Sequence, residues 1–348
     1  MKVLVTGGSG FLGRGVVAGL AAAGHEVTSG DLLVPDGPGA PGVRHVRLDV
    51  TDAAAVSAAV AGHHAVVHLA SIVDPDGMGR HAAYRVDVDG SRHVLDACVE
   101  HGVGRLVVSS SGAAYGYHAD NPVPIIEDHP VRGTSAFAYS HHKALVEHLL
   151  ADARRDHPQL EQVVLRIGTI LGDAVDNQIT ALFHRRRLLA VRGSDSPFVF
   201  IWDTDLVAIV VRAVGDGPPG TFNVAGTGTL TIHQIAARLG KRTLAIPEPV
   251  LKAVLAVGSA LRVSRYGPEQ TGFLRYRPVL DNTRLRTVFG YTPELTSAEA
   301  FDRWLAGHPD ARRARSTAPG GRQGRMSGCR PSCSSMLIPT TRRPRPRG

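Results

Sequence analysis

The sequence predicts an α/β fold built around a doubly wound parallel sheet. Short apolar runs without helical spacing indicate buried strands, and longer amphipathic stretches alternate with them along residues 1–173. The first of these strands leads directly into a glycine-rich turn. Strands and helices that alternate in this way are typical of a parallel sheet covered by helices on both faces.

The first thirty residues contain the unit around which this fold is organised. Residues 2–5 are an apolar strand, and the glycine-rich turn occupies residues 6–13. A helix is predicted over residues 14–23, followed by a strand over 26–30 that ends at Asp31. Strand, glycine turn, helix, strand and terminal acid are the parts of a Rossmann-type mononucleotide-binding unit.

This order of elements predicts a dinucleotide site. Glycines let the backbone approach a pyrophosphate, and the N-terminus of the following helix offers free N–H groups to it. Asp31 stands eighteen residues after Gly13, where a carboxylate accepts hydrogen bonds from the hydroxyls of an adenosine ribose. The same charge would repel a 2′-phosphate, so we expect NAD rather than NADP. The alternative interpretation is a glycine-rich turn with a structural role alone.

The remaining segments continue the alternation of strands and helices, which becomes less regular after residue 173. Further strands are predicted at 43–48, 65–71, 105–109 and 163–167, with helices at 51–60, 82–100 and 137–155. Later segments are predicted as helices at 178–189 and 206–214, strands at 198–202 and 221–224, and mostly helical chain over 243–305. The domains expected are an NAD-binding domain at 1–173 rejoined by 203–229, a smaller substrate lobe at 174–202 and 230–307, and a tail at 308–348.

The net charge of +8 arises at the end of the chain. Residues 308–348 hold ten Arg and one Asp, so residues 1–307 carry 29 basic and 30 acidic groups. This balance gives no reason to expect nucleic-acid binding by the folded body. The composition of the tail predicts disorder, either as a solvated extension or as a tether to nucleic acid or membrane.

The sequence also indicates a cytoplasmic protein. It contains no apolar run of membrane-spanning length and no cleavable signal pattern before the first strand. Of the three cysteines, Cys98 lies on a predicted helix and the other two lie in the tail, so no disulfide framework is expected. Cys98 is predicted to be a small, buried apolar residue.

Acid–base chemistry is suggested by Tyr139 and Lys143. Their i, i+4 spacing in the helix predicted over 137–155 puts both on one face. A lysine beside a phenol favours the phenolate and lowers its pKa from about 10. Such a tyrosine takes the proton of a substrate hydroxyl while hydride leaves its carbon, or returns it in the reverse direction. Serines at 109–111 end the preceding strand, where doubly wound sheets bind ligands.

Three motifs together resemble the extended short-chain dehydrogenase/reductases, the NAD-dependent epimerase/dehydratase group. They are the glycine turn at 6–13, the segment 109–116, and Tyr139-Ser140-His141-His142-Lys143. The resemblance continues through Leu165-Arg166 and residues 285–293, and it covers nearly all of the foldable chain. It implies an NAD-dependent enzyme.

The resemblance also assigns roles to individual residues. Ser111 takes the place of the family's catalytic serine, four residues before the Tyr-Gly pair, while Tyr139 and Lys143 match its tyrosine and lysine. Asp49-Val50 resembles the pair that brackets the adenine, and residues 69–71 resemble the loop after the fourth strand. The cofactor-binding residues implied are Gly7, Gly10, Phe11, Leu12, Gly13, Asp31, Asp49, Val50, Leu69, Ala70, Ser71, Tyr139 and Lys143. No metal site is expected.

Departures from the family pattern bear on the substrate. Asp87-Val88-Asp89-Gly90-Ser91 replaces the family's Asn-Val-x-Gly-Thr, which changes the charge near the lysine. Gly112-Ala113 follows Ser111 where sugar dehydratases have Asp-Glu, so the acid and base for removing water are missing. Residues 168–170 lack the substrate-contacting Asn of UDP-galactose 4-epimerase, and residues 196–206 lack its Arg.

Some other side chains have both a functional and a structural interpretation. Arg185-Arg186-Arg187 would bind a substrate phosphate or form a solvated helix face. Trp202, with Phe198 and Phe200, would line an apolar substrate wall or pack in the core. His141 and His142 lie within the predicted catalytic helix, one of them facing solvent.

We expect an NAD-dependent oxidoreductase or epimerase that acts on a hydroxyl or carbonyl carbon of a small molecule. Ser111 would hydrogen-bond the substrate oxygen, Tyr139 would exchange the proton, and Lys143 would lower the Tyr139 pKa while holding the nicotinamide ribose. The alternatives are a nucleotide-sugar 4-epimerase and a silent dinucleotide-binding regulator, although intact catalytic residues argue against the regulator. A nucleotide sugar, a steroid-like alcohol and a small ketone all stay open as substrates, and a homodimer is compatible with the sequence.

Overall fold

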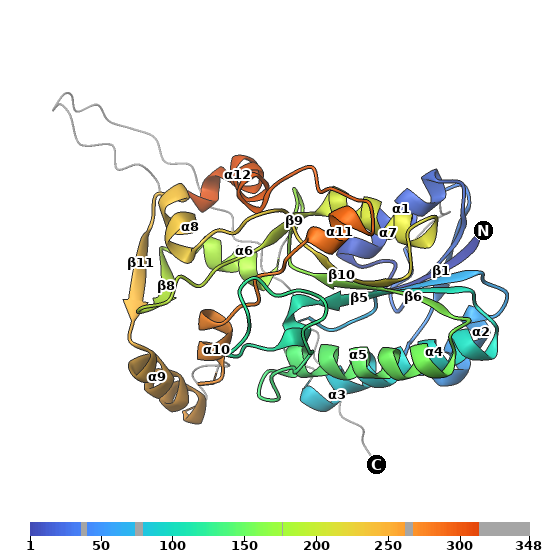
Figure 1. Cartoon of the computed structure of the whole chain (residues 1–348), viewed down its shortest axis with the longest axis horizontal. Coiled ribbons are helices and arrows are strands. Elements are labelled where there is room, and N and C mark those ends of the chain that lie inside the picture. Colours follow the sequence, from blue (N-terminus) through green and yellow to red (C-terminus); the bar gives the residue numbers. More distant parts are fainter. Residues whose placement is uncertain (36–39, 74–78, 176, 262–266, 313–348) are drawn as a thin grey trace, which may run out of the picture. The chain divides into compact units, whose positions relative to one another are not determined.

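A seven-stranded parallel sheet forms the centre of the computed structural model of this chain (Figure 1). The structure describes residues 1–35, 40–73, 79–175, 177–261 and 267–312. The strands of the sheet are β1 (Lys2–Thr6), β2 (Glu26–Asp31), β3 (Val43–Arg47), β4 (Ala65–His68), β5 (Arg105–Ser111), β6 (Glu161–Ile167) and β10 (Gly220–Val224). All four residues of β4 are buried, as expected of a central parallel strand that is covered on both faces.

The strand order places a topological switch point between β1 and β4. The order across the sheet is β10-β6-β5-β4-β1-β2-β3, and β1 pairs in parallel with both β2 and β4. The chain therefore leaves β1 in one direction and later fills the other half of the sheet from β4 outward. Open α/β sheets bind their ligands beyond the carboxyl ends of the strands at such a point.

Helices cover both faces of this sheet (Figure 1). On one face, α1 (Phe11–Ala22), α7 (Asp203–Val214) and α11 (Thr283–Thr287) bury apolar residues in a core shared with β1 and β6. On the other face, α2 (Ala53–Val60), α4 (Gly90–Glu100) and α5 (Ala138–Asp156) pack against the opposite side of the same strands. This arrangement confirms the predicted α/β, Rossmann-type fold.

A third core lies outside the large sheet. Its strands form two short parallel pairs, β7 (Thr169–Leu171) with β9 (Phe200–Trp202) and β8 (Arg187–Val191) with β11 (Arg242–Ile246). The accompanying helices are α6 (Gln178–Phe183), α8 (Ile232–Arg238) and α12 (Ser297–Gly307). Helix α10 (Gln270–Arg275) packs against β8 and α9 (Glu248–Ala260), whereas α3 (Arg80–Tyr84) packs against α5. Aromatic rings from α6, β9 and α12 pack together in this core, which therefore has its own apolar centre.

The predicted helix at 178–189 is wrong in its second half. Helix α6 ends at Phe183, and β8 begins at Arg187. Leu188 and Ala190 are buried by parallel pairing with β11, a strand that the sequence interpretation placed within mostly helical chain. Arg185-Arg186-Arg187 therefore lies in a turn and at a strand start, and the interpretation as a helix face is wrong.

Two further boundaries differ from the predictions. The helix expected over 82–100 is divided into α3, a π-helical turn at Arg85–Asp89, and α4. At the other end of the chain, Pro309–Ala311 forms a short 3₁₀ helix with Ala311 fully buried, so ordered chain continues past the predicted boundary at 308. The rest of the predicted tail, from residue 313, lies outside the described residues, and the boundary between the two predicted lobes stays a prediction.

Candidate active site

The turn after β1 lies close to the backbone at the ends of β2 and β4. Gly7 has φ +72°, in the left-handed region that favours glycine, and its N–H donates to the carbonyl of Gly30 at 2.8 Å. A Cβ on Gly7 would lie 2.7 Å from the amide nitrogen of Ala70, just beyond β4. A Cβ on Gly13 would lie 2.1 Å from the carbonyl oxygen of Gly7. Both positions therefore require glycine for the turn itself.

Helix α1 starts directly after this turn, with Gly10 as its N-cap. The first helical turn, residues 11–14, contains no acidic side chain, and Gly10 cannot cap it with a side chain. The amide groups at this end stay available to an anion, and the helix dipole favours negative charge there. Gly10, Phe11, Leu12 and Gly13, all predicted to bind the cofactor, lie at this N-terminus.

Asp31 lies at the end of β2 and holds the glycine turn in place. Its Oδ2 accepts a hydrogen bond from the amide of Ser9 at 3.0 Å, and its Oδ1 accepts one from the amide of Leu33 at 3.2 Å. Each carboxylate oxygen retains a further lone pair with which to accept from a ribose hydroxyl. The sequence interpretation assigned Asp31 to the ribose and missed its contact with the turn, because Ser9 is brought there only by the tertiary fold.

The other predicted cofactor residues lie after β3 and β4. Asp49 is exposed, and the backbone and hydroxyl of Thr51 donate to its Oδ1, so these hydrogen bonds lower the pKa of Asp49. Val50, the next residue, is buried. Leu69 donates its amide to the carbonyl of Thr6 at 3.1 Å, which carries the pairing of β1 and β4 to the edge of the sheet.

Ser111, Tyr139 and Lys143 come together at the carboxyl end of β5. Strand β5 ends at Ser111, and Tyr139 and Lys143 lie one turn apart near the start of α5. Ser111 is close enough to Tyr139 for its side chain to act on the tyrosine pKa. Nζ of Lys143 lies 5.7 Å from the centroid of the Tyr139 ring and donates to the carbonyl oxygen of Ser109 at 2.8 Å. The geometry thus offers a hydroxyl, a phenol and an ammonium within one cluster.

Burial dominates the electrostatics of Tyr139. Burial raises the pKa of Tyr139 to about 12, the Ser111 side chain acts to lower it, and the charge of Asp87 acts to raise it. Tyr139 is therefore a protonated phenol at neutral pH. The lowering of its pKa by Lys143 stays a prediction.

Asp87 and His142 form a buried pair that the sequence interpretation missed. Oδ2 of Asp87 lies 2.9 Å from Nδ1 of His142, and both side chains are at most 5% exposed. The replacement of the family's Asn by Asp87 pointed to a changed charge, but nothing local connects it to a histidine on another helix. His142 is buried, whereas its neighbour His141 is partly exposed.

A second buried polar cluster lies behind the site. The guanidinium of Arg166 donates to both carboxylate oxygens of Glu147, at 3.0 and 2.7 Å, and to the phenol of Tyr115 at 2.7 Å. Ser110, next to Ser111, also donates to Glu147. Burial acts to lower the pKa of Arg166, but the charge of Glu147 raises it overall, so the pair is ionised. This cluster fixes β5, β6 and α5 to one another beneath Tyr139 and Lys143.

Comparison with known proteins adds to this geometry. The family model for the NAD dependent epimerase/dehydratase family matches residues 3–225, more than half of the chain. The chain belongs to this family. Membership confirms the predicted family and agrees with the observed fold.

Known proteins resemble this chain over different lengths. An uncharacterised protein of Mycobacterium tuberculosis is 30% identical over 305 residues, which cover 87% of this chain but 29% of that protein. Human 3 beta-hydroxysteroid dehydrogenase type 7 is 36% identical over 207 residues, 53% of this chain and 54% of that protein. The chain thus spans less than a third of the first relative and about half of the second.

Solved structures agree with this assignment. UDP-glucose 4-epimerase of Thermus thermophilus, in complex with NAD, matches with a TM-score of 0.68 at 25% identity. The match covers 89% of this chain and 99% of the epimerase. A family architecture therefore extends through the third core as well as the large sheet.

Several residues singled out in the sequence are structural. Trp202, Phe198 and Phe200 are at most 1% exposed and pack in the third core, so the interpretation as a substrate wall is wrong. Cys98 is fully buried, and burial raises the pKa of its thiol to about 12, as expected of an inert apolar residue. Within the described ranges, no three His, Cys, Asp or Glu side chains are placed to hold a metal ion. Among the described helices, none has the length and apolar character that a membrane crossing needs.

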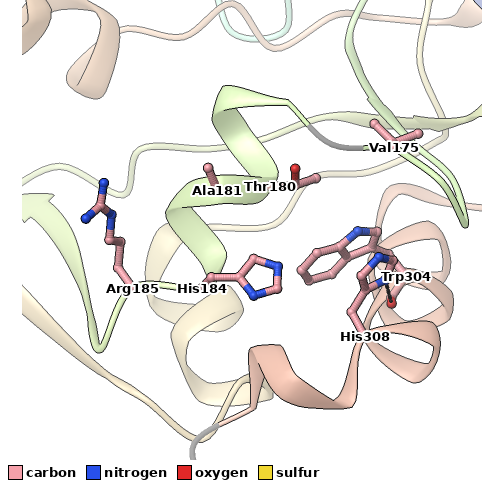
Figure 2. Close-up of a pocket in the computed structure, with 7 residues that line it drawn as sticks. All are labelled: Val175, Thr180, Ala181, His184, Arg185, Trp304 and His308. Atoms are coloured by element: carbon pink, nitrogen blue, oxygen red, sulfur yellow. Dashed lines mark hydrogen bonds between the residues drawn. The ribbon is translucent and has the colours of Figure 1, made fainter. Parts of the chain in front are cut away.

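A cavity of about 590 Å³ lies between the end of α6 and α12 (Figure 2). His184, beyond the end of α6, points toward the ring of Trp304, against which His308 stacks at 4.6 Å between ring centroids. The cavity is lined by Val175, Thr180, Ala181, His184, Arg185, Trp304 and His308. Arg185 is the one lining residue to which the sequence analysis gave a possible role, while Ser111, Tyr139, Lys143 and the predicted cofactor-binding residues do not line this cavity.

Proposed function

We propose that this chain is an NAD-dependent oxidoreductase that acts on a hydroxyl or carbonyl carbon, with Ser111, Tyr139 and Lys143 at the reacting atoms. The observation that carries the proposal is the cluster these side chains form at the carboxyl end of β5, where Ser111 is close enough to act on the pKa of Tyr139 and Lys143 lies one helical turn away. An exposed tyrosine–lysine pair on a helix surface would have neither the serine nor the burial.

The residues of the glycine turn fit a dinucleotide. Gly7 and Gly13 keep the backbone open to close approach, and the amides at the start of α1 can bind the diphosphate. Asp31 would accept from the adenosine ribose, Asp49 and Val50 would border the adenine, and residues 69–71 would lie beside the cofactor beyond β4. NAD, when bound, supplies the acceptor or donor of a hydride.

Tyr139 is the residue that would transfer the proton. With a pKa raised to about 12 by burial, this phenol holds its proton at neutral pH and is ready to donate it to a developing alkoxide. Ser111 would hydrogen-bond the same oxygen and orient it. Lys143 would bind the nicotinamide ribose and supply positive charge as the phenolate forms. In this protonated state Tyr139 can act as the acid in the reduction of a carbonyl.

Three aromatic rings beside Tyr139 favour an apolar substrate. Tyr117 and Phe137 pack edge to face at 5.3 Å, and Phe273 stacks on Phe137 at 5.6 Å between centroids. Tyr139 is close enough for its charge to affect the pKa of Tyr117. The likeness to a hydroxysteroid dehydrogenase supports the same class, an apolar secondary alcohol or ketone.

A nucleotide-sugar 4-epimerase is the second candidate, and the match to UDP-glucose 4-epimerase over 89% of the chain favours it. An epimerase would use the same three residues twice, oxidising and then reducing the opposite face. The segments at 168–170 and 196–206 argue against it, because they lack the Asn and Arg that the epimerases use.

Purified full-length protein tests the proposal against a panel of apolar ketones, steroid alcohols and UDP-sugars. We expect NADH absorbance to fall with at least one apolar ketone, and NADH consumption to be lost in Tyr139→Phe. Product analysis of the UDP-sugars detects epimers, which form without net change in absorbance. Epimerisation with no ketone reduced would replace the first candidate with the second, and NAD binding with no turnover on any compound would leave only a dinucleotide-binding regulator.

A further inference from the structure

Arg277 follows α10, and its half-buried guanidinium packs over two aromatic rings. Its Cζ lies 3.9 Å from the ring centroid of Phe198 and 4.5 Å from that of Phe273. Nη1 donates to the hydroxyl of Ser196 at 2.7 Å, whereas Nε is buried and has no hydrogen-bond partner. In the part of the chain that the structure describes, no carboxylate is paired with this guanidinium. The edge formed by Nε and Nη2 is therefore left for a ligand.

Arg275, two residues earlier, shows what is missing at Arg277. The guanidinium of Arg275 is paired with the carboxylate of Glu248 on α9. The buried guanidinium of Arg166 is likewise paired with Glu147 at 2.7 Å. Burial lowers the pKa of Arg277 to about 9, so this group still carries its charge at neutral pH. A charge that is taken out of water normally has a partner of opposite charge, and at Arg277 the described residues do not supply one.

Ser196 holds Arg277 from a strained backbone conformation. Its φ of +44° lies in the left-handed region, which residues other than glycine rarely adopt. The buried Ser196 hydroxyl donates to the carbonyl of Leu274 and accepts from Nη1 of Arg277. Strain of this kind persists only where the surrounding structure determines it, and it is concentrated at functional sites. The fold thus fixes the orientation of the guanidinium.

An aromatic cluster connects Arg277 with the helix that carries Tyr139. The ring of Phe273, over which Arg277 lies, packs against Tyr117 and Phe137 at 5.2 and 5.6 Å between centroids. Phe137 is the N-cap of α5, and Tyr139 lies in the first turn of that helix. The three rings therefore form a continuous apolar contact from the start of α5 to the guanidinium.

We infer that Arg277 is a substrate-binding residue for a carboxylate, and that the substrate is an apolar ketone or secondary alcohol that carries this carboxylate. The apolar part would pack on the three rings, while its carbonyl or hydroxyl group reaches Tyr139. A single planar guanidinium with one free edge suits one carboxylate, which it binds through two parallel hydrogen bonds. The inference rests on the proposed function, since it places the anion relative to a carbon that reacts at Tyr139.

Binding of unreactive probes tests this inference without turnover. The complex of full-length protein with NADH is titrated with decanoate and with decan-1-ol, which share an apolar chain and differ in charge, and NADH fluorescence is followed. Decanoate should bind at least about tenfold more tightly, the usual effect of a charge-assisted hydrogen bond. UDP is titrated in the same way, as a probe for the diphosphate of a nucleotide sugar.

The test variant is Arg277→Met, which keeps a flexible apolar chain against the rings and removes the charge. The matched control is Arg275→Met, which removes a guanidinium that already has a carboxylate partner and leaves Glu248 paired with Lys252. We expect the preference for decanoate over decan-1-ol to disappear in Arg277→Met and to persist in Arg275→Met.

Turnover separates this inference from the proposed function. Oxodecanoates that differ in the position of the carbonyl are compared with their methyl esters. The parent should have a kcat/KM at least about tenfold higher for one of the acids than for its ester. Equal reduction of acids and esters would keep the proposed function and reject the carboxylate site. Selective binding of decanoate without turnover of any compound would support the carboxylate site and reject the activity.

Equal binding of decanoate and decan-1-ol to the parent overturns the inference, as does an unchanged preference in a folded Arg277→Met protein or an equal loss in Arg275→Met. Tighter binding of UDP than of decanoate, lost in Arg277→Met, would assign Arg277 to a diphosphate and overturn the substrate class. Should Arg277→Met not fold, Arg277→Gln retains a donor for Ser196, and the same loss of preference is expected of it.

Discussion

The glycine turn and the Tyr139 cluster meet at one edge of the sheet, yet they are built in opposite ways. The turn at 6–13 depends on missing side chains, because a Cβ on Gly7 or Gly13 would overlap neighbouring backbone. The Tyr139 cluster depends on buried ionisable side chains, with Asp87 and Lys143 both less than a tenth exposed. The first region is thus sensitive to added volume, and the second is sensitive to lost charge or a lost proton.

The largest expected effect comes from Tyr139→Phe, which removes one oxygen and leaves the ring to pack. Turnover should fall by roughly 10²- to 10⁴-fold, the usual contribution of a positioned acid–base group. NADH affinity and thermal stability should change little, because the diphosphate site lies at the glycine turn. Activity assays, fluorescence titration and thermal melting on one preparation check all three.

Tyr276→Phe is the matched control for this variant, since it removes the same oxygen from a tyrosine near α10. Its turnover should equal that of the parent protein. Near-normal turnover in Tyr139→Phe would remove Tyr139 from the chemistry. Lost stability with a proportional loss of activity would make it a structural residue.

Gly13→Ala should affect the other region. Its Cβ would meet the carbonyl oxygen of Gly7 at 2.1 Å, a backbone atom that cannot turn away. We expect a loss of about 3 kcal/mol in the free energy of unfolding, the upper part of the range for overpacking. NADH affinity should fall with it, because the turn must widen. Chemical denaturation and fluorescence titration measure the two losses.

Gly104→Ala provides the comparison for Gly13→Ala, because its Cβ would lie an ordinary 3.7 Å from the carbonyl oxygen of His64. This variant should leave NADH affinity unchanged. Equal affinities in Gly13→Ala and the parent would mean that the cofactor does not use this turn.

A third effect arises at His68, which connects the two regions. Its ring pairs with the hydroxyl of Thr6 at 2.7 Å on one side and with the hydroxyl of Ser91 at 2.9 Å on the other. Burial lowers the pKa of His68 from 6.5 to about 3. Between these values the unfolded chain binds a proton that the native protein does not, so stability falls as the pH drops below 6.5.

The contribution of His68 can be isolated by His68→Gln, which cannot titrate in this range. At pH 5 the parent should have lost about 2 kcal/mol relative to neutral pH through this residue. The difference in unfolding free energy between parent and variant should therefore narrow as the pH falls from 7 to 5. Denaturation curves at both pH values that keep a constant difference would show that His68 is accessible to protons in the native protein.

The contrast between the two regions also explains what the sequence could predict. The unit from β1 to β2 was predictable because glycines, strand and helix follow one another within thirty residues. The Asp87–His142 pair joins positions 55 residues apart, and no local pattern marks either member. Strand β8 was missed for a similar reason, since Leu188 and Ala190 alternate over too few residues to distinguish a strand until β11 pairs with it.

The smallest expected effect concerns residues 309–312, which belong to neither the glycine turn nor the Tyr139 cluster. Their removal therefore serves as a reference for the effects expected in those two regions. Ala311 is fully buried in the third core, while the ion pair of Asp310 with His184 is largely exposed. Truncation after His308 removes both, and truncation after Arg312 keeps both. We expect the shorter protein to be less stable by about 1 kcal/mol, because burying one methyl group is worth about that much and exposed ion pairs contribute little.

Comparing the two truncations with each other, rather than with the full chain, isolates residues 309–312. Their NADH affinities should be equal, since the glycine turn and the Tyr139 cluster are unchanged in both. Equal stability would mean that the contact of Ala311 contributes nothing to folding. A difference in NADH affinity would show that the third core acts on the cofactor site, and the separation between regions on which the other predictions depend would then fail.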